Sequence, residues 1–359
     1  MARLTAAAPG SPGGGGIARR ARIAYAGTLR YQGAGGELPG TGGQMESYGG
    51  DMALRLGLGL PQTGTYDLTA DVTEVARAAE ELGYDSVWVL ERLMRPEEPL
   101  DDMYLVPGMR WADYFRSVAD PLVTLSLAAA VTERVRLGTA VLVGPLHQPL
   151  LLARALASLD AAGGGRLVAG LGTGWSRDEY AAAGAEHAAR GAALDELLDV
   201  CAAVWGPDPA AYEGRRTRFS PSAIGPKPAR PIPVLLAGGT DKALRRLVRR
   251  ADGWLPSMLS NEQIATTRSR IAELAGEAGR DPAELSTTVR AAVQLTDRPV
   301  EGRRRPHHGN VEQIVSDLTG AVRAGVQEVL LDAQLTCRDA QELIGTAKVL
   351  REAVTEAGL

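Results

Sequence analysis

Short apolar runs and longer amphipathic runs alternate along the chain from residue 54 onward. The amphipathic runs predict helices, and the apolar runs predict strands that are buried on both faces, as in a parallel sheet. The expected strands lie near residues 54–60, 86–90, 136–143, 166–171, 232–237, 252–256, 286–295 and 326–331. The expected helices lie near residues 70–82, 119–132, 148–162, 176–206, 240–251, 261–278, 310–324 and 338–356.

Eight strands, each followed by a helix, within about 300 residues predict a (β/α)₈ TIM barrel. The alternative is a doubly wound open sheet, which should keep a GxGxxG turn after its first strand. Here the first strand reads LGLGLPQTG, with Pro61 where the helix should open. The barrel is therefore the preferred architecture, and it is expected to occupy residues 52–359.

Residues 1–51 differ in composition from the rest of the chain. The runs APGSPGGGG and GAGGELPGTGG cannot bury enough apolar surface to offset the entropy of ordering the backbone. We expect a disordered, low-complexity extension or a start codon assigned too early, because Met45 and Met52 lie just before the ordered pattern.

Composition narrows the classes of function. The 359 residues are 45% hydrophobic and 23% charged, with a net charge of −4, so we expect neither a nucleic acid nor a membrane as partner. Two distant cysteines and four histidines show no disulfide or metal-ligand spacing, and no metal is expected. No apolar run reaches the ~18 residues of a membrane span. A cytoplasmic location is the expectation.

In a barrel of this kind the active site lies at the carboxyl ends of the strands. Three of these ends are rich in small residues: GTAVLVGP from Gly138, GLGTGW from Gly170 and LLAGG from Leu235. They indicate a shared floor for a ligand. Two connections are too long to be simple links, and such insertions on the catalytic rim commonly form a lid or a substrate wall. They are residues 92–118, rich in Met and aromatic side chains, and residues 206–231, whose YEGRRTRF predicts a hairpin.

The order of several motifs resembles the luciferase-like monooxygenase superfamily. These motifs are SVWVLERL, RVRLGTAVLVGPLHQPLLLARALASLD, GGGRLVAGLGTGWSRDEY, IGPKPARPIPVLLAGG and ADGWLP. Within the superfamily the chain is most similar to the actinobacterial branch of coenzyme F-420-dependent oxidoreductases. The resemblance covers roughly residues 53–356.

The resemblance implies a cofactor site at the ends of three strands. Family members place a non-proline cis peptide under the central ring of the cofactor, and the matching pair here is Ala140–Val141; the plain alternative is an ordinary barrel strand. The ring and ribityl chain would meet the fourth-strand turn, and the phosphate would meet backbone amides after the fifth strand, unless AGGT is only a tight turn and a cap. The matching residues are Gly172, Thr173, Gly174 and Asp178 for the turn, and Gly238, Gly239 and Thr240 for the phosphate.

The end of the second strand departs from the family pattern. Many relatives carry an acid–histidine pair there, and this chain has Glu91–Arg92. An arginine stays charged and cannot deliver a proton, but it can hold an anionic group or stabilise charge on the cofactor's pyrimidine edge. Glu91 would take the acid–base role if burial raises its pKa. The alternative is a Glu–Arg pair that only fixes the loop.

The same resemblance bears on the substrate. One sugar-phosphate dehydrogenase branch has an acid directly after GTG, and here that position is Trp175, so sugar-phosphate oxidation is not expected. Trp175 either walls the ring or packs under the helix. With Trp111 of the 92–118 insertion it is a candidate substrate-binding residue, which favours a small, mostly apolar substrate.

Three functions remain open at this point. The first is an F-420-dependent oxidoreductase that moves a hydride between the deazaflavin and an organic substrate. The second is a monooxygenase that uses reduced FMN and O₂, and the third is a barrel that binds a flavin-like ligand without turnover. Relatives are often homodimers, and a homodimer is expected here.

Overall fold

The strands of this protein close into a barrel of eight parallel members. The structure, a computed structural model, describes residues 53–359. Neighbouring strands pair in parallel around the sheet, and pairing between the third and fourth barrel strands closes it. The predicted TIM barrel is confirmed and the open sheet is wrong. The barrel strands are β1 (Arg55–Gly59), β2 (Ser86–Val89), β3 (Arg136–Thr139) continued by β4 (Leu142–Val143), β5 (Leu167–Gly172), β8 (Val234–Leu236), β9 (Gly253–Trp254), β10 (Ser286–Ala292) and β13 (Glu328–Asp332).

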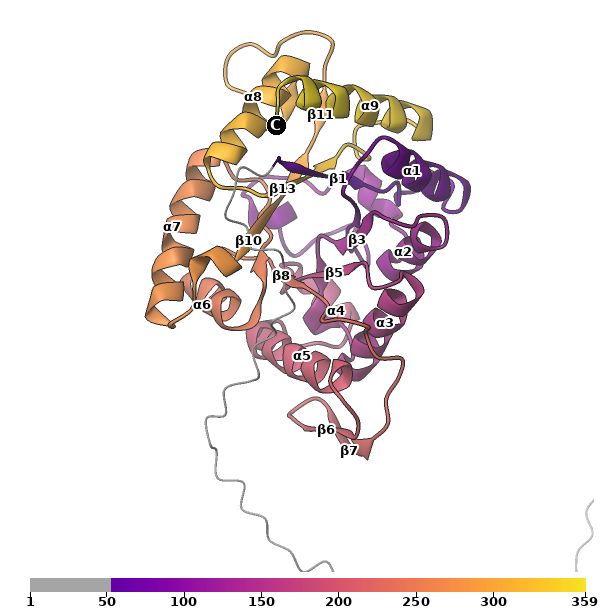
Figure 1. Cartoon of the computed structure of the whole chain (residues 1–359), viewed down its shortest axis with the longest axis vertical. Helices are drawn as coiled ribbons and strands as arrows, with labels where there is room; N and C mark the ends of the chain where they lie inside the picture. The colour runs from indigo at the N-terminus through magenta and orange to yellow at the C-terminus, as the bar shows by residue number, and fades with distance from the viewer. Residues whose placement is uncertain (1–52) are drawn as a thin grey trace, which may run out of the picture. The chain divides into compact units, whose positions relative to one another are not determined.

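Each barrel strand coincides with one of the eight apolar runs of the sequence to within one residue at its carboxyl end or lies inside it, and helices follow the strands on the outside of the barrel (Figure 1). The predicted extension over residues 1–51 lies outside the described residues. The helices are α1 (Ala70–Glu81), α2 (Pro121–Ala129), α3 (Pro149–Ala162), α4 (Arg177–Ala182), α5 (Arg190–Trp205), α6 (Asp241–Arg250), α7 (Asn261–Glu277), α8 (Val311–Arg323) and α9 (Ala340–Glu356).

The single helix predicted over residues 176–206 is wrong, because the structure has two helices there. α4 ends at Ala182, and the chain turns away at Gly184, whose φ of +63° favours glycine. The amide of Ala185 donates to the carbonyl of Tyr180 and that of Gly184 to Ala181, which is the usual hydrogen-bonding pattern of a helix terminated by glycine. A short 3₁₀ turn (His187–Ala189) then leads into α5.

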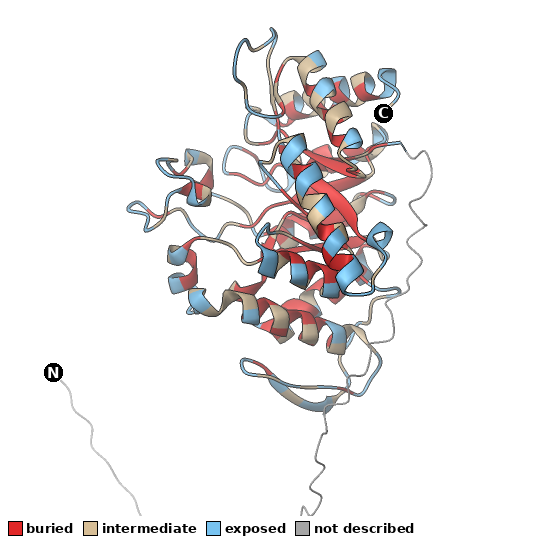
Figure 2. Ribbon diagram, turned by 90° about the vertical axis from the view of Figure 1, so that its left-hand side faces the viewer, coloured by how far each residue is buried: buried red, intermediate tan, exposed pale blue. Residues whose placement is uncertain are grey.

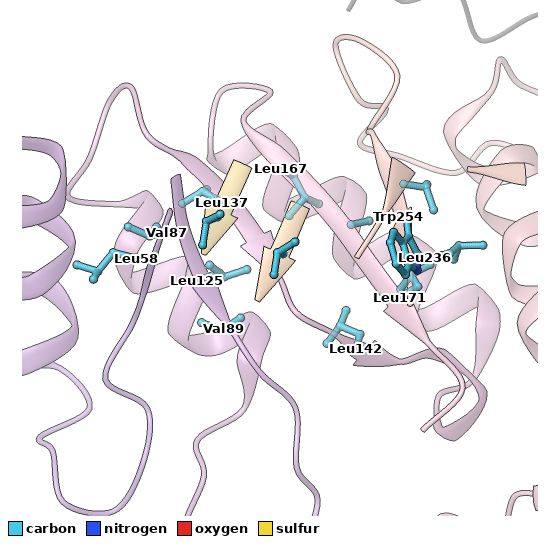
Figure 3. Packing of buried hydrophobic residues seen from close by; sticks show 14 of the residues in the cluster. Leu58, Val87, Val89, Leu125, Leu137, Leu142, Leu167, Leu171, Leu236 and Trp254 are labelled. Atoms are coloured by element: carbon cyan, nitrogen blue, oxygen red, sulfur yellow. The ribbon is translucent and has the colours of Figure 1, made fainter. Parts of the chain in front are cut away.

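The main hydrophobic core lies between the outer face of the strands and the helices. Buried residues lie in the strands and on the inner faces of the helices, while the outer faces of the helices are exposed (Figure 2). Leu171, Leu236 and Trp254 illustrate the packing, since they occupy matching positions on β5, β8 and β9 (Figure 3). Burial of this layer supplies most of the driving force for closing the barrel.

A second, smaller cluster fills the inside of the barrel. Its members are Trp88, Ala140, Val168, Leu235, Leu255 and Leu330. The indole of Trp88 takes up the room that Gly57 and Gly138 leave on the flanking strands, because a Cβ at either glycine would overlap the ring. The barrel interior is therefore a packed plug beneath the rim, as in other barrels of this type.

Within residues 53–359, two small sheets lie outside the barrel. The hairpin predicted within residues 206–231 is confirmed as the antiparallel pair β6 (Ala210–Glu213) and β7 (Arg218–Ser222). β11 (Gln294–Leu295) pairs with β12 (His308–Gly309). Among residues 53–359, no helix is both long and apolar enough to cross a membrane, and no three His, Cys, Asp or Glu side chains gather as a metal site.

The glycine beside Trp88 generates a stability prediction. Gly138→Val should force its side chain into the buried indole and lower the free energy of unfolding by about 3 kcal/mol, measured by urea denaturation. Gly276→Ala in α7 is the matched control, because nothing lies within 4 Å of its added Cβ, and it should be neutral or slightly stabilising. Equal stability of Gly138→Val and wild type would contradict the packing described.

Candidate active site

The third barrel strand is interrupted at the rim by Ala140 and Val141, which lie between β3 and β4. Their peptide bond is cis, as the resemblance implied. Ala140 is buried, and the half-buried Val141 packs on the cluster inside the barrel. The two residues form a floor of short side chains at the carboxyl end of the strand.

The glycine-rich turn after β5 packs against this floor. A Cβ on Gly172 would lie 2.8 Å from Val141 Cγ2, and one on Gly174 would lie 2.6 Å from Val143 Cγ1. Gly174 also has a φ of +62°. These glycines therefore allow two strand ends to approach each other closely, a packing reason that exists beside any contact with a ligand. The hydroxyl of Tyr180 donates to the carbonyl of Thr173 and fixes the turn.

The turn after β8 lies next along the rim, because β8 pairs with β5. Gly238 has a φ of +131°, and its carbonyl accepts a hydrogen bond from Trp254 Nε1. Gly239 faces open space, since no atom lies within 4 Å of a Cβ placed there. The side chain of Thr240 caps α6 by accepting from the amide of Ala243. Main chain at Gly239 is thus accessible beside a helix N-terminus, an arrangement suited to an anion.

Glu91 does not pair with Arg92. Its side chain is 3% exposed; one carboxylate oxygen accepts from the amide of Val143 at 2.5 Å and the other lies 2.7 Å from Nε2 of His147. Burial alone would lower the pKa of His147, but the hydrogen bond and charge of Glu91 outweigh it and raise that pKa. Glu91 therefore ties the end of β2 to the loop after β4.

Arg92 points to the other side of the strand, toward the rim. Its guanidinium lies 5.4, 5.3 and 5.0 Å from the ring centres of Trp111, Phe115 and Trp175. Nη1 donates to Glu179 Oε2 at 3.0 Å, whereas Nε is buried without a partner. The cation is thus held by three aromatic faces and one carboxylate in a dry environment, where such contacts are strong.

The start of α4 fastens the rim insertion, by which we mean residues 92–118. Glu179 accepts from the amide of Leu93 and Asp178 from the amide of Leu100. Arg177 donates to Asp101, whose carboxylate also accepts from the backbone amide of Arg177. Asp178, expected at the cofactor, is therefore occupied with the insertion.

The rim insertion carries an aromatic cluster. Trp111 and Trp175 lie 4.8 Å apart between ring centres, and Tyr104 lies 5.6 Å from Trp175. Trp175 thus contacts the insertion, which brings the two candidate substrate residues together. Burial raises the pKa of Glu179 although Arg92 and backbone amides lower it. Glu179 and His147 were not among the site residues expected above, although the acidic start of a helix directly after a glycine-rich strand end made Glu179 a candidate for lining the cofactor mouth.

The predicted cofactor residues follow three consecutive barrel strands, and Arg92 follows the strand next to them. The family described as luciferase-like monooxygenase aligns with residues 55–354 of this chain. The chain belongs to the luciferase-like monooxygenase family.

Relatives within this family use different cofactors. An uncharacterized protein of Mycobacterium tuberculosis is 38% identical over 187 residues, which are 50% of this chain and 65% of that protein. The F-420-dependent glucose-6-phosphate dehydrogenase of Nakamurella multipartita is 29% identical over 64% of this chain and 65% of its own length. The FMNH₂-dependent dimethylsulfone monooxygenase of Pseudomonas putida is 28% identical over 50% of each. The chain thus spans just under two thirds of the first relatives it matches.

Solved structures share the fold of this chain. A monooxygenase from Streptomyces bottropensis superposes with a TM-score of 0.70 at 21% identity, covering 85% of this chain and 100% of that one. The coenzyme F-420-dependent tetrahydromethanopterin reductase of Methanopyrus kandleri gives a TM-score of 0.67 at 15% identity, covering 85% and 99%. At these identities the likeness concerns the barrel alone.

The Glu91–His147 contact predicts a dependence of stability on pH. Because the pKa of His147 is raised above its ordinary value of about 6.5, the contact stabilises the folded chain fully below that value. The contribution is lost as the pH rises through the folded-state pKa. His147→Gln should lower the free energy of unfolding by about 1 kcal/mol at pH 6 and by less at pH 9, measured by urea denaturation. A loss that grows with pH would contradict this assignment.

The buried Arg92–Glu179 pair predicts a large effect of removing one partner. Glu179→Gln leaves the Arg92 charge uncompensated and should cost about 3 kcal/mol, with faster amide exchange at Leu93 in hydrogen-exchange measurements. Glu186→Gln is the control, because the Glu186–Arg215 pair is exposed and should contribute almost nothing. Similar losses in both variants would show that Arg92 does not depend on Glu179.

Proposed function

We propose that this protein is an F-420-dependent oxidoreductase that transfers a hydride between the deazaflavin and a small, mostly apolar organic substrate. The observation that supports it is the strip of small residues at the ends of β3–β4, β5 and β8, with open main chain at Gly239, in a chain of this family. Two of the relatives described above have a cofactor in their names. The match to the F-420-dependent relative is longer than the match to the FMNH₂-dependent relative.

The rim residues fit a flat, anionic-tailed cofactor. Ala140 and Val141 would lie under the ring, Gly172–Gly174 would border it, and the open backbone at Gly239 with the α6 N-terminus would meet a phosphate. When bound, the deazaflavin supplies the hydride chemistry, and the protein supplies orientation and a pocket poor in water. Asp178 accepts a hydrogen bond from the amide of Leu100, so it would influence the cofactor site only by holding the rim insertion in place.

Arg92 is the residue we assign to electrostatic stabilisation. Its guanidinium is fixed among Trp111, Phe115 and Trp175, so it can face negative charge that builds up on a ring without having to reorganise. The Glu179 carboxylate accepts from Arg92 Nη1 and from the amide of Leu93, so it holds the guanidinium in this position.

Glu91 is assigned a positioning role in this proposal. Both of its oxygens are engaged, one by the amide of Val143 and the other by His147, so the carboxylate holds the β4 loop in place. An acid–base role for Glu91 stays a prediction. Trp111 and Trp175 offer aromatic surface to an apolar substrate, and the homodimer also stays a prediction.

A monooxygenase using reduced FMN and O₂ is the second candidate, and the FMNH₂-dependent relative supports it. The two cofactors share a flat tricyclic shape, so the rim residues fit both. A barrel that binds a flavin-like ligand without turnover is the third, and spectral change of the bound cofactor on adding substrate would exclude it.

Cofactor titration tests the proposal. F-420 at 100 times its dissociation constant should raise the stability of the full chain by about 2.7 kcal/mol in thermal denaturation, with a smaller effect of FMN. Gly239→Asp should weaken F-420 binding at least tenfold, because it places a carboxylate beside the phosphate. Gly276→Asp adds the same charge in α7 and should leave binding unchanged. Stabilisation by FMN alone would replace the first candidate by the second.

A further inference from the structure

Two inward-facing carboxylates on β13 differ in their hydrogen bonding, because one has a donor at both oxygens and the other has donors at only one oxygen. Glu328 and Asp332 lie four residues apart on the same face of the strand, and they are 1% and 2% exposed. Glu328, at the amino end, accepts from Ser86 Oγ on one oxygen and from Arg136 on the other. Asp332, at the carboxyl end, accepts only on Oδ2, and its Oδ1 is buried without a partner.

The partner of Asp332 is Arg290 of the neighbouring strand β10. Arg290 Nε and Nη2 both donate to Asp332 Oδ2, at 2.9 and 2.5 Å. Burial disfavours the guanidinium charge, yet Asp332 and the side-chain oxygen of Tyr104, which also accepts a hydrogen bond from Arg290, raise its pKa. Buried ion pairs of this kind are often no more stabilising than apolar side chains of similar volume, so stability alone is a weak reason for this one.

The unpartnered oxygen packs against bare main chain on strand β1. A Cβ at Gly59 would lie 2.6 Å from Asp332 Oδ1, so only glycine at this position accommodates the carboxylate, and a ligand has to approach Oδ1 from the rim. A buried acceptor without a donor is costly, and natural proteins keep such groups rarely. Together with its place at the rim end of the barrel, where ligands bind, this favours a ligand donor over a structural role.

Arg290 and Asp332 lie across the barrel mouth from the proposed cofactor floor. Counting around the closed sheet, β10 is four strands from β3–β4, and β13 is four strands from β5. Above this side stand Tyr104, which bonds Arg290, and Tyr114, whose pKa burial raises to about 12. A substrate between the two sides would meet aromatic surface and one polar group.

The charges of Asp332 and Arg290 determine which kind of polar group on a substrate can bind beside them. The Asp332 carboxylate is neutralised by Arg290, so the pair as a whole is neutral. An ammonium group would be repelled by Arg290, and a carboxylate would be repelled by Asp332 Oδ1. A neutral donor such as a hydroxyl satisfies Oδ1 and adds no charge to a buried site.

We propose that Asp332 Oδ1, held in place by Arg290, is a recognition site for a neutral hydrogen-bond donor, such as a hydroxyl, on an otherwise apolar substrate. This inference rests on the proposed function, because it names the substrate class of the same rim. It makes Asp332 and Arg290 specificity-determining residues.

Tyr104 controls access to this site. Tyr104 and Leu105 have φ values of 56° and 58°, a left-handed conformation that bulky residues rarely adopt. The segment is held there by the bond to Arg290 and by the contact with Trp175. A substrate hydroxyl can replace the Tyr104 oxygen at Arg290 as its own hydrogen donates to Asp332.

The test compares three probes of one shape: benzyl alcohol, ethylbenzene and the benzylammonium ion. Calorimetric titration of the full chain, with and without F-420, should give benzyl alcohol at least tenfold tighter than either of the others. Tyr104→Ala removes the covering side chain and should show the same preference more strongly. Equal binding of the alcohol and ethylbenzene in both proteins overturns the inference.

Variants test whether Asp332 is the carboxylate that binds the alcohol. The double change Arg290→Met with Asp332→Leu removes both charges together, which keeps the interior satisfied, and should abolish the preference for the alcohol. Glu328→Gln changes the matched carboxylate at the other end of β13 and should retain the preference. A preference that survives the double change, in protein that unfolds cooperatively, overturns the inference.

F-420 binding is measured in the same samples, so the two proposals fail separately. Loss of the alcohol preference with normal F-420 binding refutes the recognition site alone. No F-420 binding with an intact alcohol preference refutes the proposed function and leaves the recognition site standing.

Discussion

The strict alternation of side chains along each strand of a closed barrel decides what every rim residue can do. On β2, Val87 and Val89 join the outer core, whereas Trp88 fills the interior. Continued past the strand, the same alternation sends Glu91 toward the loop after β4 and Arg92 toward the aromatic cluster of the rim. Glu91 and Arg92 are adjacent in sequence but therefore contact different partners. The different chemical roles of the two residues follow from their opposite orientations.

The strands and helices could be predicted because their signals are local. Each barrel strand is a short apolar run bounded by turn residues, and eight repeats of the same unit leave few alternative topologies. The break between α4 and α5 was missed because the residues around Gly184 are alanine-rich and keep a helical composition. The three strand ends rich in small residues were also visible, since a glycine-rich end is a local feature.

The partners within the site could not be read from the sequence. Glu91 meets His147 56 residues away, Arg92 meets Glu179 87 residues away, and Arg290 meets Asp332 across 42 residues. Each pairing depends on strand register, and a shift of one residue would turn every side chain to the opposite face. The sequence alone made Glu91–Arg92 look like a pair because adjacency was the only proximity available.

The hairpin β6–β7 stands outside the barrel, yet it reaches the rim through its turn. Glu196 of α5 accepts from the amides of Arg216 and Thr217, and the Arg216 guanidinium donates to the carbonyls of Pro145 and His147. The hairpin consequently stabilises the segment around Pro145 and His147, which places the imidazole of His147 beside Glu91. Homologous barrels with a shorter β6–β7 hairpin would lack these hydrogen bonds to the segment that carries residue 147. The length of the hairpin and the identity of residue 147 should therefore change together.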